Sequence, residues 1–199
     1  MTGEETATIT IDGKKLLEHT PSNPAPLGLV ATGLTLILLS FTYTGFFQLD
    51  SMILAMTMAF GGTGCIIVGI MENNNGNTFA TLAFGAFGSF WFSFAILSIL
   101  PKLNLATAPD AASLAAYLFM WGIWSAVMFI ITLKISRGLQ GIFFLITLLF
   151  FVLGLGALTG IGIINIFGGY VGIIVGFLAM YVGLAEVVNE IYGNRVLPT

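Results

Sequence analysis

Charged residues are scarce in this chain. Its 199 residues include six Lys and Arg and nine Asp and Glu, so 8% of the sequence is charged and 57% is hydrophobic. Soluble proteins carry about 25% charged residues, and a chain so poor in charge cannot cover a water-facing surface. The small net charge of −3 gives no reason to expect nucleic acid as a partner. The composition indicates an integral membrane protein.

Cysteine and histidine are scarcer still. Cys65 is the only cysteine, which excludes an internal disulfide and a metal site built from cysteines. It lies in an apolar stretch, where we expect a small packing residue. His19, the only histidine, lies in a polar N-terminal segment. Since no nucleophile with its base and no metal-ligating cluster falls at membrane depth, we expect neither an enzyme nor a metal or cofactor site.

Six stretches are apolar and long enough to cross a bilayer as α-helices, which takes roughly 20 residues each. They cover residues 27–47, 52–71, 79–100, 111–133, 139–158 and 167–188. Short polar or turn-forming links separate them, and the link at 159–165 is the least polar. The expected fold is an all-α integral membrane protein with six transmembrane helices in a bundle around a central pore.

The placement of Lys and Arg predicts the orientation in the membrane. With the N-terminus inside, the outer side holds Lys102 alone, and the inner segments hold Lys14, Lys15, Lys134, Arg137 and Arg195. Both termini are then cytoplasmic, in a multi-pass protein of the cytoplasmic membrane. We divide the chain into a polar cytoplasmic tail, residues 1–22, and a six-helix transport domain, residues 23–199.

Glycine is abundant, with 25 residues, and two groups of small residues are candidates for helix packing. One follows a flank of the last helix at three- and four-residue spacing: Gly169, Gly172, Gly176, Ala179 and Gly183. The other lies near the end of the fifth helix: Gly154, Gly156, Gly160 and Gly162. Small residues let helix backbones approach closely in lipid. The sequence leaves open whether these residues pack within a bundle, between subunits or around a lumen.

The interior of the predicted helices offers hydroxyl groups but no central charge. The carboxylates of Asp50, Glu72, Asp110, Glu186 and Glu190 all fall at helix ends or links. Small and polar residues share one helix face at Thr78, Thr81, Gly85, Gly88 and Ser89, and Thr147 adds a hydroxyl on another helix. This face favours a pore wall, although Ser and Thr also donate to carbonyls of their own helix. Without intramembrane charge, the solute is a small neutral molecule or a weakly held anion.

The segment Asn23-Pro24-Ala25-Pro26-Leu27-Gly28 predicts the start of the first helix. Proline suits a first turn, and Asn23 is a candidate N-cap. Free N–H groups and the positive end of the helix dipole would favour an anion here. A plain helix start explains the two prolines equally well.

At this segment the sequence resembles the acetate uptake transporter family, which includes bacterial succinate–acetate permeases. The signature Asn-Pro-Ala-Pro-Leu-Gly-Leu is complete at residues 23–29. The similarity continues to the C-terminus, through Phe60-Gly61-Gly62, Gly76-Asn77-Thr78-Phe79 and Glu186-Val187-Val188-Asn189-Glu190. The resemblance implies a six-helix protomer, assembled as a hexamer, with a pore for acetate and sometimes succinate in each protomer.

The resemblance also implies a constriction of Phe, Tyr and Leu at mid-membrane. The matching residues here are Thr32, Phe87 and Ile146. Phe87 keeps the ring but lacks the hydroxyl, and Ile146 is conservative. Thr32 replaces an aromatic residue, so the gate is looser or another residue completes it. Cys65 stands where the family has Gln.

These features together predict transport of acetate, or of another small carboxylate, through a narrow pore and with linkage to protons. No charged group lies at the centre of any helix, so a proton crosses with the substrate or the anion crosses alone. The alternative is a channel for small neutral solutes such as urea or short amides. A non-transporting scaffold would leave the helix start unexplained. The expected pore residues are Asn23, Pro24, Ala25, Pro26, Leu27, Gly28, Thr32, Thr78, Thr81, Phe87, Ile146 and Thr147.

Overall fold

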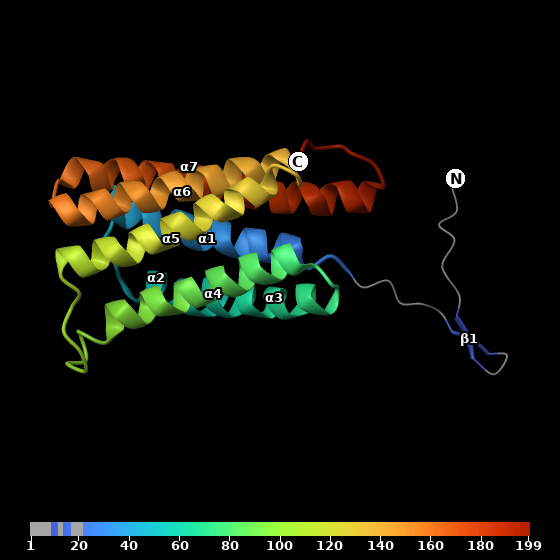
Figure 1. Ribbon diagram of the computed structural model, residues 1–199, viewed down its shortest axis with the longest axis horizontal. Helices are drawn as coiled ribbons and strands as arrows, with labels where there is room; N and C mark the ends of the chain where they lie inside the picture. Colours follow the sequence, from blue (N-terminus) through green and yellow to red (C-terminus); the bar gives the residue numbers. More distant parts are fainter. Residues whose placement is uncertain (1–8, 12–13, 17–21) are drawn as a thin grey trace.

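The computed structural model of the chain describes residues 9–11, 14–16 and 22–199. In these residues six helical segments are long and apolar enough to cross a membrane, and they lie side by side in one bundle (Figure 1). They are α1 (Ala25–Tyr43), the continuous helix α2 (Ser51–Met56), η1 (Thr57–Gly64) and α3 (Cys65–Asn74), then α4 (Thr78–Ile99), α5 (Ala111–Thr132), α6 (Arg137–Thr159) and α7 (Gly162–Tyr192). The predicted all-α fold with six membrane helices is confirmed.

The tail contains two short strands that the sequence did not predict. Strand β1 (Ile9–Ile11) pairs antiparallel with β2 (Lys14–Leu16), and Ile9 lies opposite Leu16. The remaining residues before position 22, including His19, lie outside the described residues. The proposed division between residues 22 and 23 therefore stays a prediction.

Three predicted helix boundaries were wrong, and one of them is the end of α7, which lies at Tyr192 rather than near residue 188. Helix α1 ends at Tyr43 rather than near residue 47, and Gly45 follows with a φ of +84°, which an L side chain rarely adopts. The link expected at 159–165 is much shorter. Gly160, with a φ of +69°, ends α6 as a left-handed cap, and α7 already begins at Gly162. Because the link between α6 and α7 is apolar, hydropathy does not show where one helix ends and the next begins.

The glycine flank of α7 packs closely against α1. A Cβ on Gly176 would lie 2.9 Å from the carbonyl oxygen of Gly33, and one on Gly183 would lie 2.9 Å from that of Pro26. These glycines therefore pack two helices of the same protomer together. The sequence alone left open whether they pack within a bundle, between subunits or around a lumen. Gly154 and Gly156 likewise meet Phe119 and Asn165, whereas no described atom lies within 4 Å of a Cβ built on Gly160 or Gly162.

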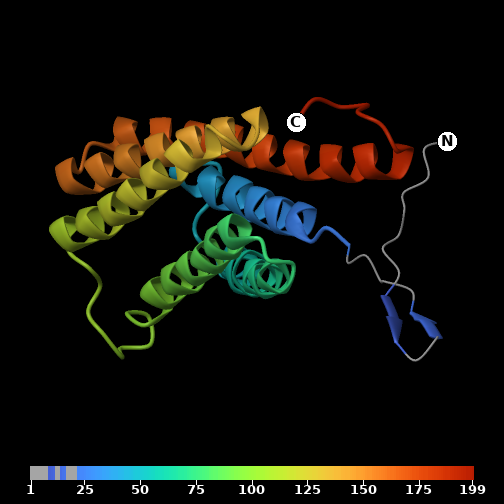
Figure 2. The same ribbon diagram turned by 45° about the vertical axis from the view of Figure 1, so that its right-hand side comes forward.

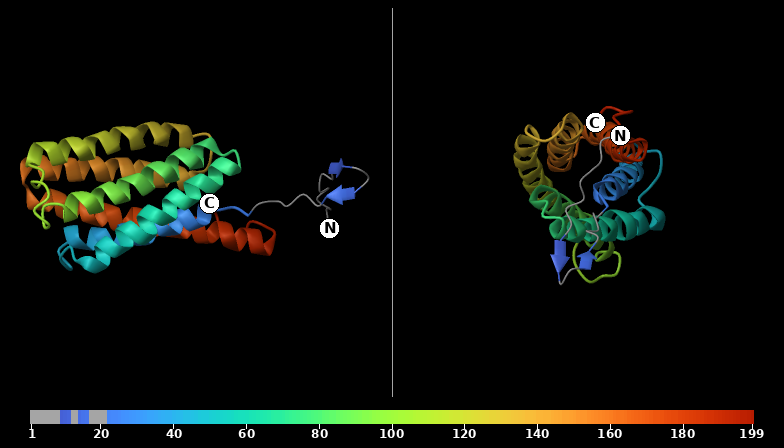
Figure 3. Two further views of the ribbon diagram at one scale, coloured as in Figure 1. Left: turned by 90° about the horizontal axis from the view of Figure 1, so that it is seen from below. Right: turned by 90° about the vertical axis from the view of Figure 1, so that its right-hand side faces the viewer.

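The helices surround a common centre when the bundle is viewed end-on (Figure 3). Helix α1 lies between α7 and the pair α3 and α4 (Figure 2). Beyond α7 the chain turns back along that helix. The side-chain oxygen of Asn189 accepts hydrogen bonds from the N–H groups of Val196 and Leu197, each at 2.8 Å, and Tyr181 donates to the carbonyl of Pro198 at 3.0 Å. This arrangement brings the start of α1, the α3–α4 turn and the end of α7 to the same end of the bundle.

Candidate functional site

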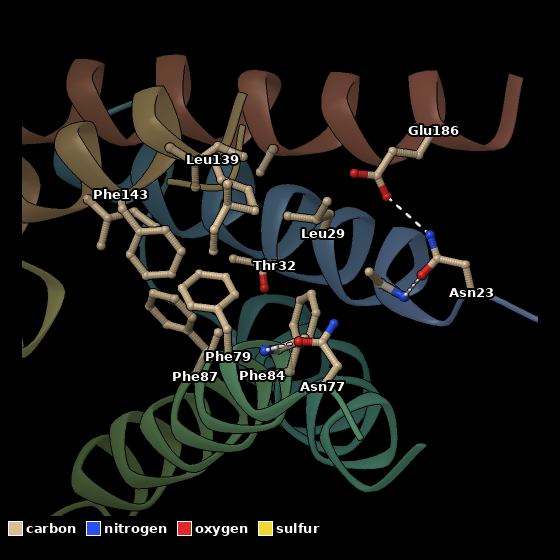
Figure 4. Close-up of a pocket in the computed structure, with 17 residues that line it drawn as sticks. Asn23, Leu29, Thr32, Asn77, Phe79, Phe84, Phe87, Leu139, Phe143 and Glu186 are labelled. Carbon is tan, nitrogen blue, oxygen red and sulfur yellow. Dashed lines mark hydrogen bonds between the residues drawn. The ribbon is translucent and has the colours of Figure 1, made fainter. Parts of the chain in front are cut away.

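A cavity of about 290 Å³, here called the wide cavity, opens at that end of the bundle between α1, α4, α6 and α7 (Figure 4). Its walls are mainly apolar and include the rings of Phe79, Phe84, Phe87 and Phe143. The polar side chains in its lining are Asn23, Thr32, Asn77 and Glu186. A mostly apolar cavity with a few converging polar groups is the usual form of a small-molecule site.

A second cavity, of about 40 Å³ and here called the narrow cavity, continues toward the other end of the bundle. Its lining is almost entirely apolar and includes Leu36, Trp91 and Phe94, with Tyr43 at the end of α1. Three residues line both cavities, and they form what we call the junction: Thr32, Phe87 and Ile146. These are the three positions that the resemblance matched to a constriction. Their placement agrees with that role, which stays a prediction.

Aromatic neighbours hold the ring of Phe87 in place at the junction. The ring meets Trp124 of α5 edge to face, with centroids 5.2 Å apart, and lies against Phe143 of α6 at 5.9 Å. Phe87 is 6% exposed and Ile146 is 2% exposed. Side chains packed from several helices have few alternative rotamers, so the apolar part of the junction has a defined shape.

Thr32 and Cys65, the two departures from the family pattern, are in contact. The Thr32 hydroxyl lies 3.3 Å from the Cys65 sulfur, and the Cys65 thiol lies 3.7 Å from the carbonyl oxygen of Gly28, to which it donates. Cys65 is fully buried, as expected of a packing residue. The hydrogen bond to Cys65 holds the side chain of Thr32, the one polar residue of the junction, in place.

The start of α1 differs from the expectation. The N-cap residue is Pro24 rather than Asn23, although the Asn23 oxygen accepts a hydrogen bond from the Ala25 N–H at 3.0 Å. Pro24 and Pro26 have no N–H group, and the Leu27 N–H donates to the Pro24 carbonyl at 3.1 Å. No backbone N–H from residue 24 to residue 27 is left to bind an anion. The predicted anion site on the backbone of this helix start was therefore wrong.

The side chain of Asn23 supplies the donor that the backbone lacks. Because its oxygen faces the Ala25 N–H, its amide nitrogen points toward α7 and donates to the Glu186 carboxylate at 3.5 Å (Figure 4). Asn77 repeats the arrangement at α4, where its oxygen accepts from the Ala80 N–H at 3.1 Å. We call Asn23, Asn77 and Glu186 the polar mouth of the wide cavity. The NH₂ groups of its two asparagines can donate hydrogen bonds to the carboxylate of a bound molecule.

Asn77 was not among the predicted site residues, although its position carries a usable signal. An Asn directly before an apolar run is a helix-start signal, and Asn77 precedes α4 as Asn23 precedes α1. Both asparagines use their oxygen at a helix start, which leaves their NH₂ groups for other partners. The sequence pattern pointed only to Asn23, because the two prolines that follow it made that helix start conspicuous.

Two carboxylates lie near this end of the bundle. Glu186 of α7 lines the wide cavity, whereas Glu72 of α3 is outside its lining. Glu72 is 2% exposed, and its Oε1 atom has no hydrogen-bond partner among the described residues. The Asn77 N–H donates to the Glu72 carbonyl at 2.9 Å, which ties this acid to the mouth.

The small and polar face of α4 does not line either cavity. Thr81 and Ser89 donate to carbonyls of their own helix, at 2.8 and 2.9 Å, and line an open groove beside α3. A Cβ on Gly88 of the same face would lie 2.8 Å from the carbonyl oxygen of Gly62. The face therefore packs on the helix before it and lines neither cavity, and the pore wall expected there stays a prediction.

The remaining predicted pore residues are also outside the two cavities, with one exception. Thr147 donates to the Phe143 carbonyl at 2.7 Å, and neither Thr147 nor Thr78 belongs to either lining. In the helix-start segment Ala25 lines the wide cavity, whereas Pro24, Pro26, Leu27 and Gly28 do not. Gly28 instead packs on the Phe84 ring, where a Cβ would clash.

Comparisons with known proteins agree with this architecture. The model of the GPR1/FUN34/yaaH family matches residues 7–196. The succinate-acetate/proton symporter SatP of Escherichia coli K12 is 45% identical over 177 residues, which cover 89% of this chain and 94% of SatP. An uncharacterized protein of Methanothermobacter thermautotrophicus is 48% identical over 185 residues, covering 89% of this chain and 91% of that protein. The solved structure of the bacterial acetate channel SatP matches with a TM-score of 0.89 at 44% identity, covering 90% of this chain and 99% of that one.

Proposed function

The chain belongs to the GPR1/FUN34/yaaH family, and from that premise we propose that it transports acetate across the cytoplasmic membrane through its own six-helix bundle. The observation that carries the proposal is the junction, where Thr32, Phe87 and Ile146 line both cavities. Two cavities in series, separated by the mainly apolar junction, suit a solute as small as acetate. SatP is named a symporter in one of these comparisons and a channel in the other, so we place this chain among transport proteins and not among enzymes.

The chemistry of the wide cavity fits a short carboxylic acid. Its phenylalanine rings can pack against a methyl group. The amide nitrogens of Asn23 and Asn77 can donate hydrogen bonds to the carboxylate of the substrate at the mouth. The junction then selects against charge, because an unpaired anion is very costly to bury among apolar side chains. Carboxylic acids titrate near pH 4 in water, so the neutral form is a small fraction at neutral pH and grows as the pH falls. We propose that acetic acid crosses the junction in neutral form.

The orientation and assembly follow from the sequence argument. From the distribution of Lys and Arg we propose that the polar mouth lies on the cytoplasmic side, together with both termini. We also propose the hexamer that the resemblance implies. Large apolar side chains on the outer faces, such as Met120, Ile130 and Ile163, are 64–68% exposed, and lipid or further copies of the chain would cover them.

Uptake of labelled acetate into proteoliposomes tests the proposed path. We expect competition by propionate and formate but not by urea, which is the test of the alternative neutral-solute channel. Ile146→Trp would fill the junction and should reduce uptake at least tenfold. Val127→Trp, at a site on α5 that is 54% exposed, is the matched control and should transport normally. Normal acetate uptake by Ile146→Trp, or urea uptake without acetate uptake, would refute the proposal.

A further inference from the structure

We propose that Thr32 is a specificity-determining residue of the junction, and that its hydroxyl oxygen accepts a hydrogen bond from the O–H group of acetic acid as the acid crosses. Cys65 is the positioning residue that turns the hydroxyl to this use. The inference rests on the proposed acetate transport and names a residue that recognises the substrate between the two cavities. Thr32 lines both cavities, and it is the one polar residue of the junction beside Phe87 and Ile146.

The hydroxyl of Thr32 is bonded differently from other hydroxyls of the membrane helices. Ser89 and Thr147 each donate to the carbonyl four residues earlier in their own helix, at 2.9 and 2.7 Å. For Thr32 that carbonyl belongs to Gly28, and it accepts from the thiol of Cys65 at 3.7 Å. The Thr32 oxygen lies 3.3 Å from the Cys65 sulfur, so its hydrogen bond runs to α3 rather than along α1.

These two contacts set the direction of the hydrogen bonds. A carbonyl oxygen can only accept, so the thiol hydrogen of Cys65 lies toward Gly28, and the sulfur remains an acceptor. The Thr32 hydroxyl then donates its own hydrogen to that sulfur. Its oxygen keeps its lone pairs and points from α1 toward the phenylalanine rings of the cavity wall (Figure 4). The junction therefore offers a solute an acceptor rather than a donor.

An acceptor at this position distinguishes solutes by their hydrogen-bonding groups. Acetic acid carries an O–H group, which can donate to the Thr32 oxygen and so replaces a hydrogen bond that the acid loses on leaving water. A carboxylate has acceptors only, so it gains no hydrogen bond from this oxygen. The O–H bond of the acid stays intact, and no atom is transferred to the protein. Phe87 and Ile146 thus select by shape, whereas Thr32 selects by chemistry.

Uptake of labelled acetate by two variants of Thr32 tests the assignment. Thr32→Val keeps the branched shape of the side chain and removes the oxygen. Its maximal uptake per inserted protein should fall about fivefold, as expected for the loss of one neutral hydrogen bond. The acetate concentration for half-maximal uptake should stay unchanged, because the substrate binds first at the polar mouth. Thr32→Ser keeps the hydroxyl and should restore most of the wild-type rate.

Two further variants separate the hydroxyl from its surroundings. Thr35 lies about one turn further along α1, is fully buried and lines neither cavity, so Thr35→Val is the matched control and should transport normally. Cys65→Ala frees the Gly28 carbonyl, and the Thr32 hydroxyl can then turn to its own helix. Maximal uptake should therefore fall in Cys65→Ala, and adding this change to Thr32→Val should lower the rate no further.

The possible failures are distinguishable. A wild-type protein that takes up no acetate refutes the proposed function. If the wild type is active, a Thr32→Val variant with the wild-type maximal rate refutes the role of Thr32 alone. So does a Thr32→Ser variant as slow as Thr32→Val, or an equal loss in Thr35→Val. Should Thr32→Val insert poorly, Cys65→Ala decides, because an unchanged maximal rate there refutes the proposed use of the Thr32 hydroxyl.

Discussion

Replacing Phe87 with Ala should turn the junction from a size filter into an open passage. Phe87 is the largest of the three junction residues and lines both cavities. Its removal would join the wide cavity of about 290 Å³ to the narrow cavity of about 40 Å³ through the space of the lost ring. Butyrate and lactate, which are longer or bulkier than acetate, should then pass.

The size of the effect follows from two magnitudes. One methylene too many in a closely fitting site changes selectivity by about 1–3 kcal/mol, or roughly 10–200-fold, so the butyrate-to-acetate uptake ratio should rise at least tenfold. Truncating a buried Phe costs about 3–5 kcal/mol of stability. The cost should lie near the lower limit here, because part of the Phe87 surface faces cavities rather than packed atoms.

The assay compares uptake of labelled acetate, butyrate and lactate at equal amounts of reconstituted protein. Phe84→Ala is the matched control, since Phe84 lies on the same helix, is buried to a similar degree at 7% exposed, and lines the wide cavity without reaching the junction. Phe84→Ala should lose stability without widening the substrate range. An unchanged butyrate-to-acetate ratio in Phe87→Ala would show that the size filter lies elsewhere.

The remaining predictions concern the mouth, the junction and the packing of α1. Asn23→Ala removes one of two amide donors and should raise the acetate concentration for half-maximal uptake about tenfold, near the lower limit for a hydrogen bond to a charged group; unchanged uptake kinetics would exclude this donor role. Thr32→Phe should narrow the junction, break the contact with Cys65 and lower acetate uptake, and faster uptake would contradict the assigned geometry. Gly176→Leu meets the Gly33 backbone and Ile37 and should lower the thermal midpoint in detergent, since overpacking costs about 1–3 kcal/mol. Gly162→Ala, in open space, should not change it.

The sequence was sufficient for the helices because their signal is local. A run of apolar residues reports a membrane span without knowledge of its neighbours, and all six runs were found. The ends of the helices were harder to predict where the chain turns at a glycine with positive φ and no polar residues mark the turn. Gly45 and Gly160 both take positive φ values, and an apolar stretch on both sides conceals them.

The small and polar face of α4 lines neither cavity, because a shared helix face does not identify the neighbour that the face meets. The small residues of α4 suggested a lumen, but Gly88 instead allows close contact with the backbone of Gly62 in η1. The residues of the junction were found only through the resemblance, since nothing about Thr32, Phe87 or Ile146 is unusual in its own stretch. The contact between Thr32 and Cys65 joins two helices and has no local signal.

The positions of Glu72 and Glu186 show why the ends of apolar stretches are poor guides to the surroundings of a charge. The last apolar stretch stops near residue 188, which made Glu186 a helix-end residue, but α7 continues to Tyr192 and carries Glu186 within the helix beside the wide cavity. Glu72 lies near the end of α3, yet it is 2% exposed, and the Asn77 N–H donates to its carbonyl at 2.9 Å. The acid that lines the wide cavity therefore lies within a helix, at a position that the apolar stretch alone assigned to a helix end.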